Sequence, residues 1–476
     1  MNCNFKKNII KGLLHITIFV SPIISIAQDF RILKQISLDE NFSISTLEYG
    51  RNEYGIGILN SRGIMTNEQK FKLSPKDCGI LGDNIFLIAA KMKNGIKVTG
   101  YSALLFNKKS LAPAGEQELI TKQNSSRISS TLLKDPLNNV HYVLLRETKY
   151  DDGFSFFGPS IYDTKFLESE SIQLLSFNNK LESKPIDIKT EAINAYFADA
   201  CSDVKKNIYL CSFTKESIMV EKFDSTGKFL SKLSSPFSVW KNPNFDIIMN
   251  IDKGNQQSVI IATKCLNQDK KMAHNVICFD FASNKVMKTG EILLNKDYCR
   301  ALKSPNEEAK GNNFSSIEEL KPIQIFQDSV RVIVEKEILY DESEGSGNPI
   351  SHNRRGSIIT VYDKKNFEVI RDIVIDKKFS TYVEQSEGIN AHLVGNILYA
   401  VTCERAGLLS YKTFVYNINL TSGEVIKNEI EKEDIGKGKV TFPSQVAWFK
   451  NNFAVPFFVL TSFTSKTETA FMLRSY

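Results

Sequence analysis

The chain has 476 residues, 42% of them hydrophobic and 24% charged, and a formal net charge of +6 at neutral pH. This near-neutral balance argues against a nucleic-acid-binding protein, which normally shows a strong basic excess. It is equally unlike an acidic disordered chain. Length alone would suggest two or three domains, although all-β architectures can exceed that rule.

The first 27 residues have the layout of a secretory signal peptide. Three lysines precede an apolar run at residues 13–27, and Ser25 and Ala27 occupy the −3 and −1 positions of a cut before Gln28. A membrane helix needs about 20 apolar residues, and this run is shorter and contains a proline. We therefore expect cleavage after Ala27, export to the periplasm or the cell exterior, and no transmembrane span.

A short pattern recurs along the rest of the chain: an apolar or aromatic residue, then Asp or Asn, then a polar turn. In EKFDSTGKFLSKL (221–233) this turn is flanked by the alternation typical of paired strands. Asp, Asn, Gly and Ser suit such turns because they tolerate left-handed backbone or bond their own main chain. The turn residues of the seven copies are Asn60, Asn107, Asp163, Asp224, Asp280, Asp363 and Asn417.

A second element precedes each turn: a polar pair followed by a short apolar strand, as in DNIFLIAAK and KNIYLCSF. A continuously apolar strand is expected where both of its faces are buried. With one strand before it and one after the turn, each repeat has four strands, which we call a (inner), b, c and d (outer). Such units, recurring every 40 to 50 residues or so, predict a β-propeller, because one sheet cannot bury both faces alone.

This repeat makes the chain resemble secreted bacterial β-propeller repeat proteins over nearly the whole of residues 28–476. The resemblance implies an all-β fold with a single β-propeller domain and no particular activity. Seven turns and a further c strand at the C-terminus favour eight blades, with seven as the alternative. TAFMLRSY at the C-terminus reads as a c strand without a d partner, and we expect the N-terminal strand QDFRILKQISL to supply that partner and close the ring.

One repeat is longer than the others and contains FSSIEELKP. Ser315 and Glu318 in this stretch form a helix capping box, and Pro322 ends the segment. We therefore expect an insertion with a short helix at about residues 303–322.

Cys201 and Cys211 stand symmetrically about residues 204–207. A hairpin centred there would place the two side chains opposite each other, close enough for a disulfide. We predict this bridge; the alternative is a pair of buried thiols that pack as small apolar side chains.

The b–c loops are longer and more varied than the c–d turns, and function tends to lie on variable loops held by a rigid scaffold. We predict a binding surface for a protein or glycan on the b–c face, formed by aromatic anchors and charged partners. The alternative is an ordinary solvated loop surface. The candidate binding residues are Arg146, Glu147, Asp151, Asp152, Phe154, Glu335, Tyr340, Asp341, Glu342, Arg354, Glu404, Arg405 and Tyr411.

Support for catalysis is weak, because the chain contains no HExxH, GxSxG, phosphate-loop or dinucleotide motif. Two acidic pairs, Asp151-Asp152 and Asp341-Glu342, follow b strands, but neither has the DxDxDG pattern of a calcium loop. We therefore predict no metal and no cofactor. Glu147, Glu335 and Glu404 each follow a b strand, and a glycan-active hydrolase or lyase with these carboxylates in the central funnel is the alternative function. A structural component of the cell envelope is the third possible function. We favour a non-catalytic binding scaffold.

Overall fold

A computed structural model of the chain defines its fold. The residues that it describes are 31–50, 53–93, 97–121, 126–149, 170–191, 196–214, 217–236, 247–266, 272–288, 292–293, 319–341, 352–378, 389–405, 411–430, 439–441, 443–459 and 469–476. In these residues the regular structure is β-strand apart from one 3-10 turn, η2 (Pro443–Gln445). They include no helix that is long and apolar enough to cross a membrane.

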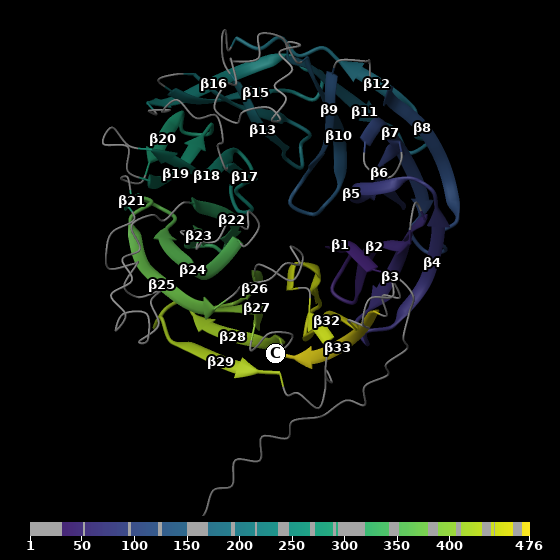
Figure 1. Cartoon of the computed structure of the whole chain (residues 1–476). Helices are drawn as coiled ribbons and strands as arrows, with labels where there is room; N and C mark the ends of the chain where they lie inside the picture. Colours follow the sequence, from purple (N-terminus) through teal and green to yellow (C-terminus); the bar gives the residue numbers. More distant parts are fainter. Residues whose placement is uncertain are drawn as a thin grey trace, which may run out of the picture.

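Eight antiparallel sheets stand around a central axis and form the blades of a β-propeller (Figure 1). Within the first seven blades the strands follow chain order from the axis outward. The predicted all-β propeller and the favoured count of eight blades are therefore confirmed.

The a and b strands build the inner half of each blade. The a strands are β1 (Arg31–Ser37), β5 (Ser74–Leu81), β9 (Ser126–Lys134), β13 (Tyr196–Ser202), β17 (Ile247–Ile251), β22 (Glu319–Gln327), β26 (Ile389–Val394) and, in blade 8, the pair β30 (Lys439–Thr441) and β31 (Ala447–Trp448). The b strands are β2 (Phe42–Gly50), β6 (Asn84–Lys93), β10 (Val140–Lys149), β14 (Ile208–Phe213), β18 (Ser258–Leu266), β23 (Arg331–Asp341), β27 (Ile397–Arg405) and β32 (Asn452–Val459).

The c and d strands complete the blades toward the outside. The c strands are β3 (Glu53–Asn60), β7 (Lys97–Asn107), β11 (Glu170–Phe177), β15 (Ser217–Phe223), β19 (Met272–Asp280), β24 (His352–Asp363), β28 (Tyr411–Asn419) and β33 (Thr469–Ser475). The d strands are β4 (Met65–Phe71), β8 (Pro113–Thr121), β12 (Ser183–Ile186), β16 (Phe229–Pro236), β20 (Lys285–Lys288), β25 (Val369–Lys378) and β29 (Val425–Glu429). A two-residue strand, β21 (Ile292–Leu293), also pairs with β19.

The b strands are apolar on both faces because each blade is covered by two neighbours. In β6, Ile85 and Leu87 pack in the cluster shared with blade 1, while Phe86 and Ile88 pack in the cluster shared with blade 3. Successive side chains of a strand point to opposite faces. The apolar core is thus divided into layers between the blades.

The c–d turns are held by their first Asp or Asn, as the repeat predicts. Asp224 Oδ1, for example, accepts the N–H of Thr226 at 2.8 Å. Two turn assignments need correction. In blade 3 the residue in this role is Asn178, which accepts the N–H of Lys180, whereas Asp163 lies outside the described residues; in blade 7 it is Asn419 rather than Asn417.

The N-terminal strand does not close the ring, contrary to our expectation. β1 pairs with β2, from Arg31 opposite Glu48 to Ser37 opposite Ser43, and is the inner strand of blade 1. β33 is the c strand of blade 8, as predicted, and among the described strands it pairs only with β32. An alternating sequence fits an inner or an outer strand equally well, so its pattern did not distinguish the two positions.

The last four residues of the insertion predicted at about 303–322 belong to a strand. β22 begins at Glu319, so residues 319–322 form the start of the inner strand of blade 6 rather than the end of a helix. Residues 303–318 lie outside the described residues. Pairing with β23 decides the conformation of residues 319–322, and the helix at the capping box itself stays a prediction.

Cys201 and Cys211 are free thiols in the structure, so the predicted bridge is not formed. The β13–β14 register pairs Cys201 with Tyr209 and Cys211 with Asp199. The two cysteines are therefore diagonal neighbours, and such neighbours lie about 7 Å apart or more, beyond the usual span of a disulfide.

Candidate functional site

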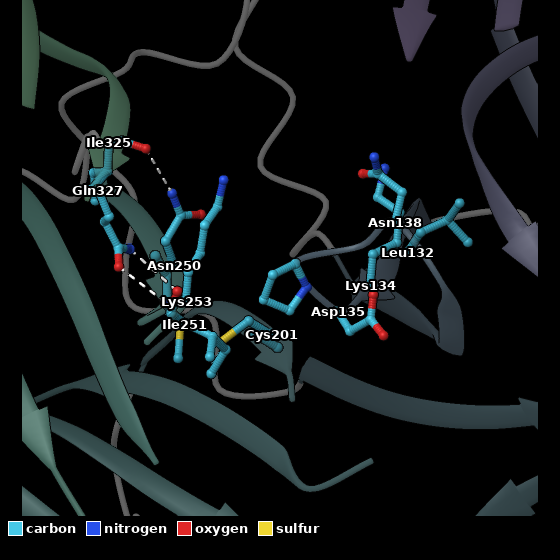
Figure 2. A pocket seen from close by; sticks show the side chains of 13 residues that line it. Leu132, Lys134, Asp135, Asn138, Cys201, Asn250, Ile251, Lys253, Ile325 and Gln327 are labelled. Atoms are coloured by element: carbon cyan, nitrogen blue, oxygen red, sulfur yellow. Dashed lines mark hydrogen bonds between the residues drawn. The ribbon is translucent and has the colours of Figure 1, made fainter. Parts of the chain in front are cut away.

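A cavity of about 330 Å³ lies where the inner strands of blades 3 to 6 end in their a–b turns. Its walls come from β9, β13, β17 and β22, four strands far apart in the sequence. Figure 2 shows Asn250, Lys253 and Gln327 on one side, and Lys134 and Asp135 across from them. The ring closure of the fold therefore brings polar groups from several blades to one place.

The wall formed by blades 5 and 6 is fixed by side-chain amides. Asn250 Nδ2 donates to the carbonyl oxygen of Ile325 at 3.3 Å, and Gln327 Nε2 donates to the carbonyl oxygen of Ile251 at 3.2 Å (Figure 2). Gln327 Oε1 accepts the backbone N–H of Lys253 at 3.1 Å. These bonds join the inner edges of two blades that share no sheet pairing.

The opposite wall rests on an ion cluster between three inner strands. Asp77 Oδ1 of β5 lies 2.6 Å from Lys34 Nζ of β1 and 3.1 Å from Lys134 Nζ of β9. Lys134 Nζ also donates to the carbonyl oxygen of Cys78 at 3.1 Å. Burial opposes ionisation of Asp77, but the two lysines outweigh it and lower the pKa of this carboxyl below its ordinary value.

The β9–β10 turn forms one rim of the cavity. Asp135 Oδ1 accepts the N–H groups of Leu137 at 2.8 Å and Asn139 at 3.0 Å. The carbonyl oxygen of Asn138 accepts the N–H of Ile80 at 2.9 Å, which ties the turn to the inner strand of blade 2. Leu137 at the tip of this turn is 68% exposed. The rim is thus a fixed turn with an apolar tip.

The chemistry of these walls suits binding. Apolar side chains from all four strands, such as Leu132, Met249 and Ile325, lie beside amides and lysines, as in pockets that hold a ligand by shape and a few polar contacts. Burial raises the pKa of Cys201, the thiol that lines the cavity, well above its ordinary value, and a protonated thiol is a poor nucleophile. No group of three metal-ligating side chains occurs among the residues described.

None of the predicted b–c residues whose side chains are described lines this cavity. Glu335 is buried on β23. Glu404 accepts hydrogen bonds from Tyr416 Oη at 2.8 Å and Lys427 Nζ at 2.8 Å. Neither residue lines the cavity. The Glu404 carboxylate is already hydrogen-bonded within its own blade, to Lys427 and Tyr416.

The other predicted residues are described only in part. The Arg146 guanidinium lies 5.6 Å from the centre of the Phe197 ring. The strands include the backbones of Glu147, Tyr340, Asp341, Arg354, Arg405 and Tyr411, but their side chains are not described, and Asp151, Asp152, Phe154 and Glu342 lie outside the described residues. The b–c binding surface stays a prediction.

Sequence reasoning missed the cavity residues because it concentrated on long loops. Their signal is an amide side chain within the last residues of an a strand, one or two positions before the Asp of the a–b turn. Asn250 in IIMNID and Gln327 in IQIFQD both fit this description. Asn250 stands two positions before Asp252 and Gln327 one position before Asp328, so the two do not occupy equivalent points and the sequence alone does not indicate a site.

No protein-family model matches the chain, and no curated protein matches it significantly. Among solved structures, it is similar to the Dos1 propeller, with 11% identity over 93% of this chain and 94% of that one and a TM-score of 0.45. It is also similar to the β-propeller domain of the Trilobed protease from Pyrococcus furiosus, with 10% identity over 85% and 95% and a TM-score of 0.40. A prolyl endopeptidase structure matches with 8% identity over 90% of this chain and 54% of that one, with a TM-score of 0.43. These likenesses concern the fold.

Proposed function

We propose that the protein is an exported, non-catalytic β-propeller that binds an extended segment of a partner protein in the cavity at the a–b end of its inner strands. Export is supported by the basic and apolar pattern of residues 1–27. The single observation that carries the binding function is the convergence of four inner strands on one cavity with fixed polar and apolar walls.

A protein segment fits the cavity better than a glycan. The described residues that line the cavity include no aromatic side chain, whereas the C–H faces of a sugar ring pack well on the negative face of an aromatic ring. Backbone N–H and C=O groups of a peptide match the lysines and amides of the walls, and its side chains match the apolar surface. The exposed Leu137 at the rim adds an apolar contact outside the cavity.

Site-specific photo-crosslinking tests this function. A benzoylphenylalanine replaces Leu137 at the rim, and in the control protein it replaces Val369, which is also exposed but lies on the outer strand β25. We expect the Leu137 probe to capture one recurrent peptide segment of one partner in the exported fraction, and the Val369 probe not to capture it. Asn250→Tyr, which places a bulkier side chain in the cavity, is expected to abolish that crosslink without lowering the unfolding temperature by more than a few degrees.

The function is wrong if both probes capture the same proteins, or if Asn250→Tyr leaves the crosslink intact. It is also wrong if the purified protein cleaves the captured segment, because the proposal includes no catalysis.

A further inference from the structure

The carboxylates of the a–b turns next to the cavity are directed into their own turns. Asp203 is 1% exposed; its Oδ1 accepts the N–H of Asn207 at 2.9 Å, and its Oδ2 accepts Tyr209 Oη at 3.1 Å. Asp252, also buried, accepts the N–H of Gly254 at 2.7 Å and pairs with Lys364 Nζ at 2.7 Å. These acids are therefore already engaged within the fold.

The lysines of the same two turns point to solvent. Lys205 and Lys206 of the β13–β14 turn and Lys253 of the β17–β18 turn are exposed, and none forms an ion pair with a carboxylate of the described residues. Lys253 also lines the cavity. Burial, and after it the charge of Lys253, lowers the pKa of His392 on the inner strand of blade 7.

The two turns are held together as one rim. The backbone N–H of Val204 donates to Gln256 Oε1 at 3.3 Å, and Tyr209 Oη, whose one proton goes to Asp203, lies 3.4 Å from the carbonyl oxygen of Gln256. The carbonyl oxygen of Lys206 accepts Tyr142 Oη of blade 3 at 2.7 Å. Lys206 itself has a φ of 64°, a conformation that costs free energy in residues other than glycine and persists only where its surroundings impose it.

We infer that Lys205, Lys206 and Lys253 form a cationic rim that selects an acidic peptide segment. The inference rests on the proposed function and names the class of segment that the cavity accepts. Three exposed ammonium groups on fixed turns attract carboxylates over about one Debye length, roughly 8 Å at physiological salt. Charge complementarity of this kind raises the association rate and suppresses unsuitable partners.

The test is fluorescence anisotropy with labelled octaglutamate, and with labelled octaglutamine as the neutral counterpart. We expect octaglutamate to bind at least tenfold more tightly than octaglutamine, and to weaken at least fivefold when sodium chloride rises from 50 to 300 mM. Lys205→Gln, Lys206→Gln and Lys253→Gln together are expected to weaken octaglutamate binding at least tenfold.

The matched control carries the same loss of charge elsewhere. Lys70→Gln, Lys184→Gln and Lys232→Gln remove three exposed lysines from the outer strands β4, β12 and β16, and we expect less than a twofold change in octaglutamate binding. An equal loss in both triple variants would overturn the inference, because net charge alone would then explain binding. Competition by inorganic phosphate or by anionic vesicles at the same carboxylate-equivalent concentration would also overturn it, because the rim would then not select a peptide.

The failures of the two proposals are distinguishable. If Asn250→Tyr abolishes the Leu137 crosslink while the rim variant leaves it unchanged, the cavity binds a segment and the cationic rim plays no part. If neither variant changes the crosslink, the cavity itself is not the binding site.

Discussion

Asp199 carries a carboxyl group whose ionisation opposes folding. It lies on β13 opposite Cys211, and its Oδ1 accepts the N–H of Ala200 at 2.8 Å. Burial raises its pKa to about 6, whereas a free aspartate titrates near 3.9 or so. Between these two values the folded state holds a proton that the unfolded state releases, so stability falls as the pH rises through this window.

Asp199→Asn is therefore expected to stabilise the protein at pH 7.5 and to have little effect near pH 4. Each unit of pKa shift corresponds to about 1.4 kcal/mol, and because Asp199 keeps some solvent contact we expect a gain of about 1–2 kcal/mol. Urea unfolding at the two pH values measures it. Glu116→Gln, an exposed site on β8, is the control, and a gain that is the same at both pH values would contradict the explanation.

At the scale of strands, Asp77 connects the inner strands of three blades. It pairs with Lys34 of β1 and Lys134 of β9, and without it two ammonium groups would face each other near the axis. The pKa of Asp77 is lowered, because the lysines outweigh the opposing effect of burial. Its contribution to stability is therefore fully present above the unfolded pKa of about 3.9 and is lost as the pH falls from there through the lower pKa of the folded protein.

Asp77→Asn is expected to lower the free energy of unfolding by about 1–2 kcal/mol at pH 7, a value kept small because Lys34 is partly exposed and screened by solvent. At pH 3 the difference from the unsubstituted protein should be smaller than at pH 7, because the stabilisation is lost as the pH falls from the unfolded pKa through the lowered folded one. Chemical unfolding at both pH values checks this. Glu53→Gln, which removes an exposed pair with Lys70, should change stability by less than about 0.5 kcal/mol.

The strands that the sequence predicted best are those with the simplest physical requirement. The b strands β6 and β14 must be apolar on both faces, and the c–d turns of their blades begin with Asn or Asp. Both features can be read directly from the sequence. The c–d turn of blade 3 was assigned to Asp163 because SIYDTKFLE has the same pattern as a true turn. Only the pairing of β10 with β11 identifies Asn178 as the turn residue. The cavity was not predicted because Asn250 and Gln327 meet only after the ring forms.

At the scale of the whole molecule, the ring closes without strand exchange among the described residues. Blades 1 and 8 meet through the carbonyl oxygen of Glu40, which accepts the N–H of Lys450 at 2.9 Å, and through Asn452 Nδ2, which donates to the carbonyl oxygen of Ser61 at 2.9 Å. Their shared buried cluster is small: Leu59, Ala447, Phe449 and Ala454. The clusters that the described residues form between other neighbouring blades contain from six to fourteen buried side chains, so the described part of this seam buries the fewest.

From this small described cluster and the absence of strand exchange among the described residues, we expect the ring to open locally at the seam before it unfolds. Phe449→Ala removes the largest side chain of the cluster and is expected to cost about 3 kcal/mol. Hydrogen exchange of β31–β32 and β1–β2 should then accelerate, while exchange in β13–β16 on the far side of the ring stays close to its original rate. Phe279→Ala, at the larger interface between blades 4 and 5, should lower global stability without selective exchange at the seam. If Phe449→Ala accelerates exchange equally in all eight blades, the ring unfolds as one unit and the seam is not its point of opening.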